Sequence, residues 1–303
     1  MNEIRIALDW TPNVNHIGFF AAKELGYYEN VHLDLKISNP IDDNYQKTPG
    51  KKLEEGLVDF AIAPSETIIS LNNKTNRVNA IGVFALLQED LSSIASLASS
   101  RFKSPRELDG KVYASYKARY EDQIVMRMLV NDGGKGNLEI IYPDKLGIWN
   151  TLLDGKADAT WIFDNWEGVE AAGKGIELNK YRMHDFAIPY GYSPVLIATK
   201  ESIIANSPVF KKFISATKKG YLFVKNNPAL AAEILRKYVT DYDRENIDLM
   251  ASCTASMKYF GDQTTCGRFD FKRVDSFLNW LVEHHLEDKV ILEQQLFTNE
   301  LID

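Results

Sequence analysis

Short apolar runs of strand length alternate with helical repeats over the first two thirds of this chain. Strands are expected at residues 4–8, 33–37, 59–63, 80–84, 111–115, 139–142 and 159–163. Helical periodicity covers residues 17–25, 65–72, 119–131, 146–154 and 166–172. Strands separated by helices favour parallel pairing, so the pattern predicts an α/β fold with largely parallel sheets. Beyond residue 207, helical spacing at 209–226, 229–238 and 271–285 predicts a helical layer over the folded part.

Size, charge and cysteine count limit the class of protein. At 303 residues with 45% hydrophobic side chains, the chain can build two cores of ordinary size. The formal net charge of -7 is spread without a basic block, which argues against nucleic acid or an anionic membrane surface as a partner. The cysteines, Cys253 and Cys266, exclude a disulfide framework and leave either one bridge or two thiols.

No apolar run approaches the ~20 residues that span a bilayer. The first strand begins at residue 4, with no signal peptide before it. The sequence as written therefore predicts a cytoplasmic protein. A secreted protein that has lost its leader would read the same way, so a periplasmic or cell-surface location is the alternative.

The stretch 9–16, which reads DWTPNVNH, lies between the first strand and the first helix. Open α/β sheets present ligand-binding side chains in such turns. Pro12 restrains the residue before it, so the turn is stiff and Trp10 is held in place. Trp10, Asn13 and His16 are therefore candidate ligand residues. The alternative is that Trp10 caps the core, Asn13 caps a helix and His16 satisfies nearby backbone groups.

A weak internal repeat runs through the α/β region. LEEGLVD at 53–59 precedes one strand, and LLDGKAD at 152–158 precedes another. In each copy a helix ends at glycine, which tolerates left-handed geometry, and a strand follows aspartate. Polar turns follow both strands, PSET at 64–67 and DNWE at 164–167. The repeat therefore predicts two similar lobes that face one another.

The histidines have no metal-ligand spacing with carboxylates or thiols. No Ser-His-Asp order, phosphate-cradling glycine loop or paired acid and base stands out. This pattern favours a binding protein, and neither a metal nor a cofactor is expected.

Five motifs resemble one known family. They are DWTPNVNHIG at 9–18, KELGYY at 23–28, GLVDF at 56–60, SPRELDGK at 104–111 and YSPVL at 192–196. Together they resemble the periplasmic-binding-protein-fold family of thiamine-pyrimidine precursor proteins, over about residues 3–230. That family contains ABC-importer receptors for formylaminopyrimidine-type thiamine precursors. It also contains fungal enzymes that make hydroxymethylpyrimidine phosphate from pyridoxal phosphate and a histidine of their own chain.

The resemblance implies a two-lobed, type II periplasmic-binding-protein-like fold in which the chain crosses the hinge twice. Lobe one would contain residues 1–95 and 198–303, and lobe two residues 96–197, with hinge crossings near 93–99 and 193–199. The ligand would bind between the lobes, which close over it by hinge rotation.

The resemblance also separates the binding proteins from the synthases. The synthases carry a lysine that holds the pyridoxal and, four residues on, the histidine that is consumed. Aligned on Asp59, those positions are here Ala63 and Thr67, and IPYGY at 188–192 replaces a cysteine-rich run. The chain therefore looks like the non-synthase branch. An intracellular enzyme of this family with altered chemistry is the alternative.

The site implied by the resemblance takes a flat aromatic nitrogen heterocycle. Trp10 would sandwich the ring with Tyr190 or Tyr192. Glu66 and Glu167 would accept hydrogen bonds from an aminopyrimidine, or would only complement helix dipoles.

Further candidates follow the strand at 111–115 and the second copy of the repeat. Arg119 would contact a phosphate or carboxylate at a helix start, or would be a solvated charge. Trp161 is expected in the core, whereas Trp166 is a ligand candidate. The candidate ligand residues are Trp10, Asn13, His16, Ser65, Glu66, Tyr116, Arg119, Tyr120, Asn165, Trp166, Glu167, Tyr190 and Tyr192. The expected partners of this monomer are a small molecule and, if the protein is exported, an ABC importer permease.

Overall fold

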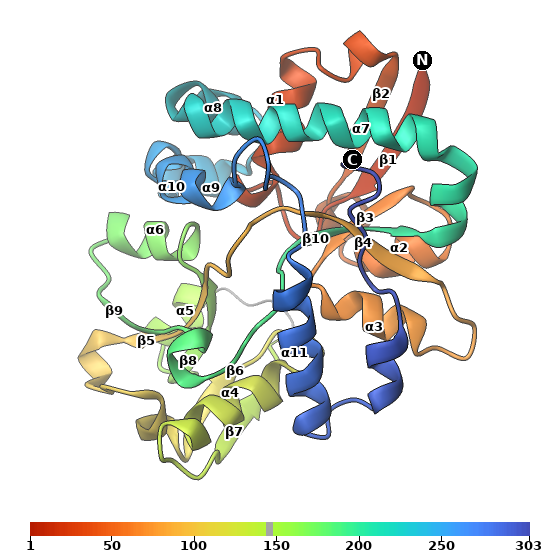
Figure 1. Cartoon of the computed structure of the whole chain (residues 1–303). Helices are drawn as coiled ribbons and strands as arrows, with labels where there is room; N and C mark the ends of the chain where they lie inside the picture. The colour runs from red at the N-terminus through yellow and green to blue at the C-terminus, as the bar shows by residue number, and fades with distance from the viewer. Residues whose placement is uncertain (144–147) are drawn as a thin grey trace. The chain divides into compact units, whose positions relative to one another are not determined.

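The computed structural model describes residues 1–143 and 148–303 of the chain (Figure 1). It divides into two compact units. Unit 1 contains Met1–Asp90, Gly191–Val274 and Glu293–Asp303, and unit 2 contains Leu91–Tyr190 and Asp275–Leu292. The expected bounds placed all of 198–303 in lobe one, whereas the structure groups 275–292 with unit 2. Residues 146 and 147 of the helix expected at 146–154 lie outside the described residues.

The sheet of unit 1 has five strands in the order β2-β1-β3-β10-β4. β1 pairs in parallel with β2 and β3, whereas β10 pairs antiparallel with β3 and β4. Four of the five strands therefore run in the same direction, and β10 runs against them. The strands are β1 (Asn2–Ala7), β2 (Leu33–Ser38), β3 (Phe60–Ala63), β4 (Ala80–Ala85) and β10 (Val195–Thr199).

The sheet of unit 2 has the same design, in the order β7-β6-β8-β5-β9. β6 pairs in parallel with β7 and β8, and β5 pairs antiparallel with β8 and β9. β5 is the reversed strand here. The strands are β5 (Ser92–Leu97), β6 (Lys111–Ala114), β7 (Leu138–Ile141), β8 (Ala159–Phe163) and β9 (Leu178–Tyr181).

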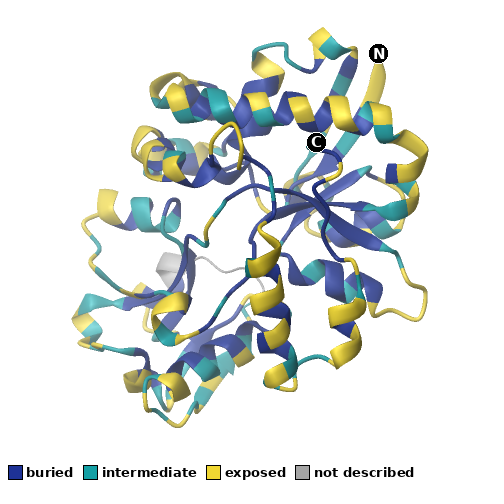
Figure 2. Cartoon of the chain, viewed as in Figure 1, coloured by how far each residue is buried: buried dark blue, intermediate teal, exposed yellow. Residues whose placement is uncertain are grey.

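Helices cover both sheets, and Figure 2 shows the inner strands β3 and β10 of unit 1 and β8 and β5 of unit 2 as mostly buried. Unit 1 carries α1 (Ile17–Glu24), α2 (Pro49–Glu54), α3 (Glu66–Asn72), α7 (Lys200–Asn226), α8 (Pro228–Arg236), α9 (Asp241–Asn246) and α10 (Leu249–Ser256). Unit 2 carries α4 (Glu121–Asn131), α5 (Ile148–Leu153), α6 (Glu167–Gly173) and most of α11 (Phe271–Glu283). α7 starts earlier than expected, and its kink at Asn206 lies just before Pro208.

The internal repeat performs the same task in each unit. The backbone N–H of Asp59 donates to the carbonyl of Arg5 at 2.9 Å, and its carboxylate accepts from the Arg5 N–H at 2.8 Å. Asp158 makes the same pair of bonds to Val112, at 2.8 and 2.9 Å. Each aspartate therefore locks the start of a central strand, β3 or β8, onto its parallel neighbour.

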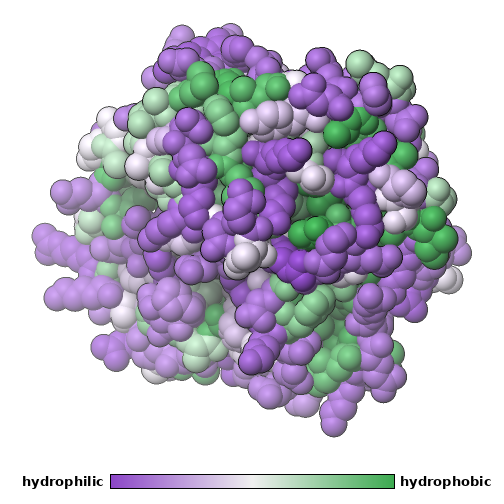
Figure 3. Space-filling model, turned by 45° about the horizontal axis from the view of Figure 1, so that its top comes forward, coloured by the Kyte–Doolittle hydropathy of each residue, from purple (hydrophilic) through white to green (hydrophobic). Residues whose placement is uncertain are grey.

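The end of the chain covers the outer edge of β4. The N–H of Gly82 donates to the carbonyl of Leu296, and the N–H of Thr298 donates to the carbonyl of Gly82, both at 2.9 Å. Figure 3 shows mostly hydrophilic side chains on the face that it draws, with small apolar patches between them. None of the described helices is both long and apolar enough to cross a bilayer.

Candidate functional site

In each unit the candidate residues, except Tyr190 and Tyr192, follow the carboxyl ends of two neighbouring parallel strands. In unit 1 these are β1, followed by residues 9–16, and β3, followed by 64–67. In unit 2 they are β6, followed by 115–120, and β8, followed by 164–167. The carboxyl ends of parallel strands share one edge of a sheet, which is where open α/β sheets bind ligands.

The turn after β1 is held by its own side chains. His16 is fully buried, and its Nδ1 accepts from the backbone N–H of Asn13 at 3.3 Å. Its Nε2 therefore carries the proton and donates to Asp9 Oδ1 at 2.7 Å. The side chain of Asn13 accepts from the N–H of Asn15 at 2.9 Å and donates to the carbonyl of Thr11 at 3.1 Å. These bonds give Asn13 and His16 a structural task within the turn.

Trp10 lies on the outside of this rigid turn. Its residue surface is 36% exposed, and its ring meets Tyr45 edge-on at 6.4 Å between centroids. A residue of α7 also supports the turn, because the hydroxyl of Tyr221 donates to the carbonyl of Asn15 at 2.7 Å. The turn thus presents an indole ring on a base that is fixed from both sides.

The turn after β3 is tied to the segment that leads into β10. The N–H of Ser65 donates to the carbonyl of Tyr192 at 3.1 Å. Ser65 and Glu66 are both buried, and the hydroxyl of Ser65 donates to Glu66 Oε2 at 3.3 Å. The hydroxyl of Tyr192 accepts from the N–H of Asp270 at 2.9 Å, and the guanidinium of Arg273 lies 4.5 Å from its ring centroid. Tyr192 is therefore fastened within unit 1.

A buried carboxylate organises the loop after β6 in unit 2. Glu121 accepts from the backbone N–H of Tyr116 at 3.0 Å, from that of Ala118 at 3.1 Å and from the hydroxyl of Tyr113 at 2.9 Å. Burial raises the pKa of Glu121, and the two backbone donors act against that rise. Tyr116 keeps 37% of its surface exposed at the top of this loop.

The same loop contains two strained residues. Lys117 and Tyr120 have φ angles of 62° and 66°, in the left-handed region that L side chains seldom adopt. Arg119, between them, donates to the Tyr120 hydroxyl at 2.6 Å and pairs with Glu287. The Tyr120 hydroxyl donates to Glu287 at 2.5 Å. Arg119 is thus part of a partly buried ion-pair network, which sequence spacing does not indicate.

The turn after β8 mirrors the turn after β3. The N–H of Asp164 donates to the carbonyl of Leu91 at 2.8 Å, just before the reversed strand β5. Glu167 Oε2 accepts from the N–H of Phe163 at 2.9 Å at the start of α6. Asn165 and Trp166 are both buried.

One aromatic candidate of unit 2, Tyr190, belongs to a cluster of aromatic side chains. Tyr190 is buried between Trp161 and Phe277, with centroids at 5.2 and 5.5 Å. Trp161, expected in the core, is buried in β8 as part of this cluster. The structure therefore brings Tyr190 and Trp161 together within one unit.

Three residues that shape the site were absent from the candidate list. Glu121 orders the 115–120 loop, Glu287 pairs with Arg119, and Tyr221 supports the 9–16 turn. Glu121 could have been chosen as the helix-start carboxylate next to Tyr120. Glu287 and Tyr221 are remote in sequence, and no local pattern marks them.

No cluster of three metal-ligating side chains occurs in the described parts of the chain. The sequence left either one disulfide or two thiols for Cys253 and Cys266. In the structure both are free, buried thiols. Burial raises the pKa of each thiol to about 12.

Two five-stranded α/β sheets, each with one reversed strand, define the class of periplasmic-binding-protein folds. The solved periplasmic aliphatic sulphonate binding protein SsuA from Escherichia coli has this fold, with a TM-score of 0.70, 15% identity and 100% of both chains covered. The chain belongs to the NMT1/THI5-like family, whose sequence model matches residues 13–231. This confirms the resemblance described above.

Two curated relatives agree with the family. The formylaminopyrimidine-binding protein of Halalkalibacterium halodurans is 22% identical, over 99% of this chain and 90% of its own. A putative thiamine biosynthesis protein of Haemophilus influenzae is 24% identical, over 78% of this chain and 73% of its own.

Proposed function

We propose that this protein binds a small aromatic nitrogen heterocycle of the thiamine-pyrimidine precursor type and works as a solute-binding protein. The observation that carries the proposal is the 9–16 turn, which holds Trp10 partly exposed on a prebuilt hydrogen-bonded base. A preordered aromatic platform loses little entropy when a flat ring stacks on it. The name of the Halalkalibacterium relative supports the ligand class.

The chemistry of the turns suits an aminopyrimidine. Trp10 and Tyr116 offer ring faces, and Glu66 and Glu167 are carboxylates at equivalent helix starts. A carboxylate accepts hydrogen bonds from an exocyclic amine. It therefore distinguishes an aminopyrimidine from a pyrimidine that carries hydrogen at the same position. In this proposal, stacking supplies affinity and the carboxylates supply selectivity.

Calorimetry with two matched probes tests this. 4-Amino-2-methylpyrimidine should bind, and 2-methylpyrimidine, which lacks the amine, should bind at least tenfold more weakly. Equal affinity for both would remove the carboxylates from the proposal, and no binding of either would overturn the ligand class. Native mass spectrometry of the purified protein would identify any ligand that it retains.

The second candidate is an enzyme of the hydroxymethylpyrimidine phosphate synthase family with altered chemistry. Ala63 ends β3, and Thr67 lies in the first turn of α3. Neither side chain can form an imine or supply an imidazole. Addition of pyridoxal phosphate should therefore give no aldimine absorbance and no pyrimidine product. Either signal would favour the enzyme.

Location, partners and motion complete the proposal. We expect a cytoplasmic carrier or sensor, with a periplasmic or cell-surface receptor serving an ABC importer permease as the alternative. Fractionation of cells that express the natural gene decides between them. Hinge rotation near 93–99 and 193–199 would close the lobes on the ligand. Light scattering during gel filtration would test the expected monomer.

A further inference from the structure

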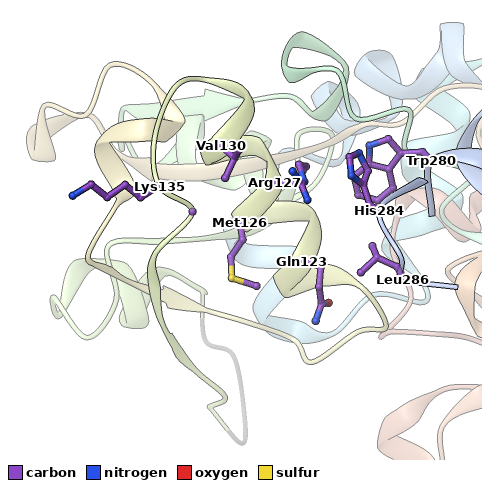
Figure 4. Close-up of a pocket in the computed structure, with 9 residues that line it drawn as sticks. Gln123, Met126, Arg127, Val130, Lys135, Trp280, His284 and Leu286 are labelled. Carbon is purple, nitrogen blue, oxygen red and sulfur yellow. The ribbon is translucent and has the colours of Figure 1, made fainter. Parts of the chain in front are cut away.

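A pocket lies within unit 2 and is separate from the candidate site at the strand-end turns. It has a volume of about 190 Å³ and lies between α4, the turn that follows it and the end of α11 (Figure 4). On α4 it is lined by Gln123, Met126, Arg127 and Val130, which recur at helical spacing on one face. The opposite face of α4, with Ile124 and Met128, is buried in the core.

The far wall of the pocket is formed by the side chains of Trp280, His284 and Leu286. Trp280 is 6% exposed, and its Nε1 has no hydrogen-bond partner among the described residues. Its ring meets the imidazole of His284 edge-on at 4.7 Å. The nitrogen itself has almost no accessible surface, so Trp280 meets the pocket through its ring.

The charge that lines the pocket is positive. Arg127 lies on the side of α4 that faces Trp280 and His284 (Figure 4), and no hydrogen bond or ion pair joins its guanidinium to another described residue. Burial, and then Arg127, lower the pKa of His284, so the imidazole is neutral at pH 7 and Arg127 supplies the charge. The ammonium of Lys135 points away from this group in Figure 4. None of the described residues that line the pocket is acidic.

We propose that this pocket binds a small organic carboxylate, whose anionic head pairs with Arg127 while its apolar body packs on Met126, Leu286 and the ring of Trp280. The volume sets the size of the ligand. An engineered cavity of about 150 Å³ holds benzene, so about 190 Å³ accommodates a single aromatic ring with one carboxylate. The proposal is independent of the function assigned to the strand-end turns.

Benzoate is the probe, and NMR of the full ¹⁵N-labelled chain is the readout. The chain has five tryptophans, so five indole N–H signals are expected, and Trp280→Phe identifies one of them by its loss. Benzoate should shift the Trp280 signal in a saturable way, whereas neutral benzamide should not. Shifts confined to other indole signals, or equal shifts with benzamide, would overturn the proposal.

Charge-matched variants complete the test. Arg127→Gln should weaken benzoate binding about tenfold or more, because it removes the charged donor. Lys135→Gln removes the same charge from the rim and should change the affinity less than twofold. Equal weakening by both variants, or by neither, would show that Arg127 does not hold the carboxylate and would overturn the proposal.

Discussion

Trp10 and Tyr116 keep 36% and 37% of their surfaces exposed, whereas Asn13, His16 and Glu121 are buried and bonded within the same loops. The sequence indicates which turns carry the candidate residues, because polar residues at strand ends are visible in the apolar pattern. It does not distinguish the side chains that hold a turn together from the side chains that the turn exposes to a ligand. That difference depends on hydrogen bonds such as the one between His16 and Asp9. The spacing of residues in the sequence does not reveal the geometry of such a bond.

Trp10→Ala should weaken binding of 4-amino-2-methylpyrimidine by about 1–3 kcal/mol, because stacking and burial are lost. Its melting temperature without ligand should stay close to that of the parent protein, because the ring is partly exposed. The matched variant Trp166→Ala removes a 4% exposed tryptophan and should cost about 3–5 kcal/mol of folding stability. A large fall in melting temperature for Trp10→Ala would place Trp10 in the core.

Glu121→Gln should destabilise the protein by about 1–3 kcal/mol. The amide has a single acceptor oxygen, so at least one of the donors from Tyr116, Ala118 and Tyr113 loses its partner. Urea unfolding measures the change. Glu139→Gln makes the same charge change at an exposed position and should stay within about 0.5 kcal/mol of the parent. Equal effects would mean that Glu121 does not organise the loop.

Cys253 and Cys266 should react slowly with a thiol reagent in the folded protein. With each pKa raised to about 12, roughly one thiol in 10⁴ is ionised at pH 8, and both are buried. Ellman's reagent should titrate two thiols in guanidinium and label the native protein at least a hundredfold more slowly. Rapid native labelling would contradict the burial of these side chains.

At the scale of elements, the alternation of strands and helices predicted the parallel strands well. It did not identify β5 and β10 as strands, because 93–99 and 193–199 were interpreted as extended crossings between lobes. Both are reversed strands inside the sheets. β9, with sequence LNKY, was missed because an edge strand can be polar on both sides. The glycines of the repeat, Gly56 and Gly155, have the expected left-handed φ angles of 66° and 67°.

The packing of α1 on α7 makes a sharp test at this scale. A Cβ atom at Gly220 would lie 2.0 Å from the carbonyl oxygen of Gly18, so the two backbones would have to separate. Gly220→Ala should therefore cost about 3 kcal/mol or more. Gly173→Ala in α6 meets no atom within 4 Å and should be neutral or slightly stabilising. Guanidinium unfolding of both variants gives the comparison, and similar stabilities would contradict the close approach.

At the scale of the molecule, the boundaries between units fall at four places, whereas the resemblance implied two crossings. The extra pair of boundaries encloses residues 275–292, in which Glu287 pairs with Arg119 of the loop before α4. Hydrophobic periodicity predicted α11 as a helix. It did not tell which sheet this helix would cover, because an amphipathic face fits any apolar layer.

Ligand binding should reduce the radius of gyration in small-angle scattering, if the lobes close by hinge rotation. The comparison uses the protein alone and with saturating 4-amino-2-methylpyrimidine. Trp10→Ala at the same ligand concentration is the control and should show a smaller change. No change at confirmed saturation would contradict closure.

The strand edge that residues 296–298 cover has a consequence for biosynthesis. The residues that pair with Gly82 of β4 are synthesised more than two hundred residues after it. Until residues 296–298 have left the ribosome, that edge offers unpaired N–H and C=O groups to other chains. We expect the growing chain to depend on chaperones during synthesis. We also expect a variant that stops at residue 292, and so lacks these partners, to aggregate in the cell.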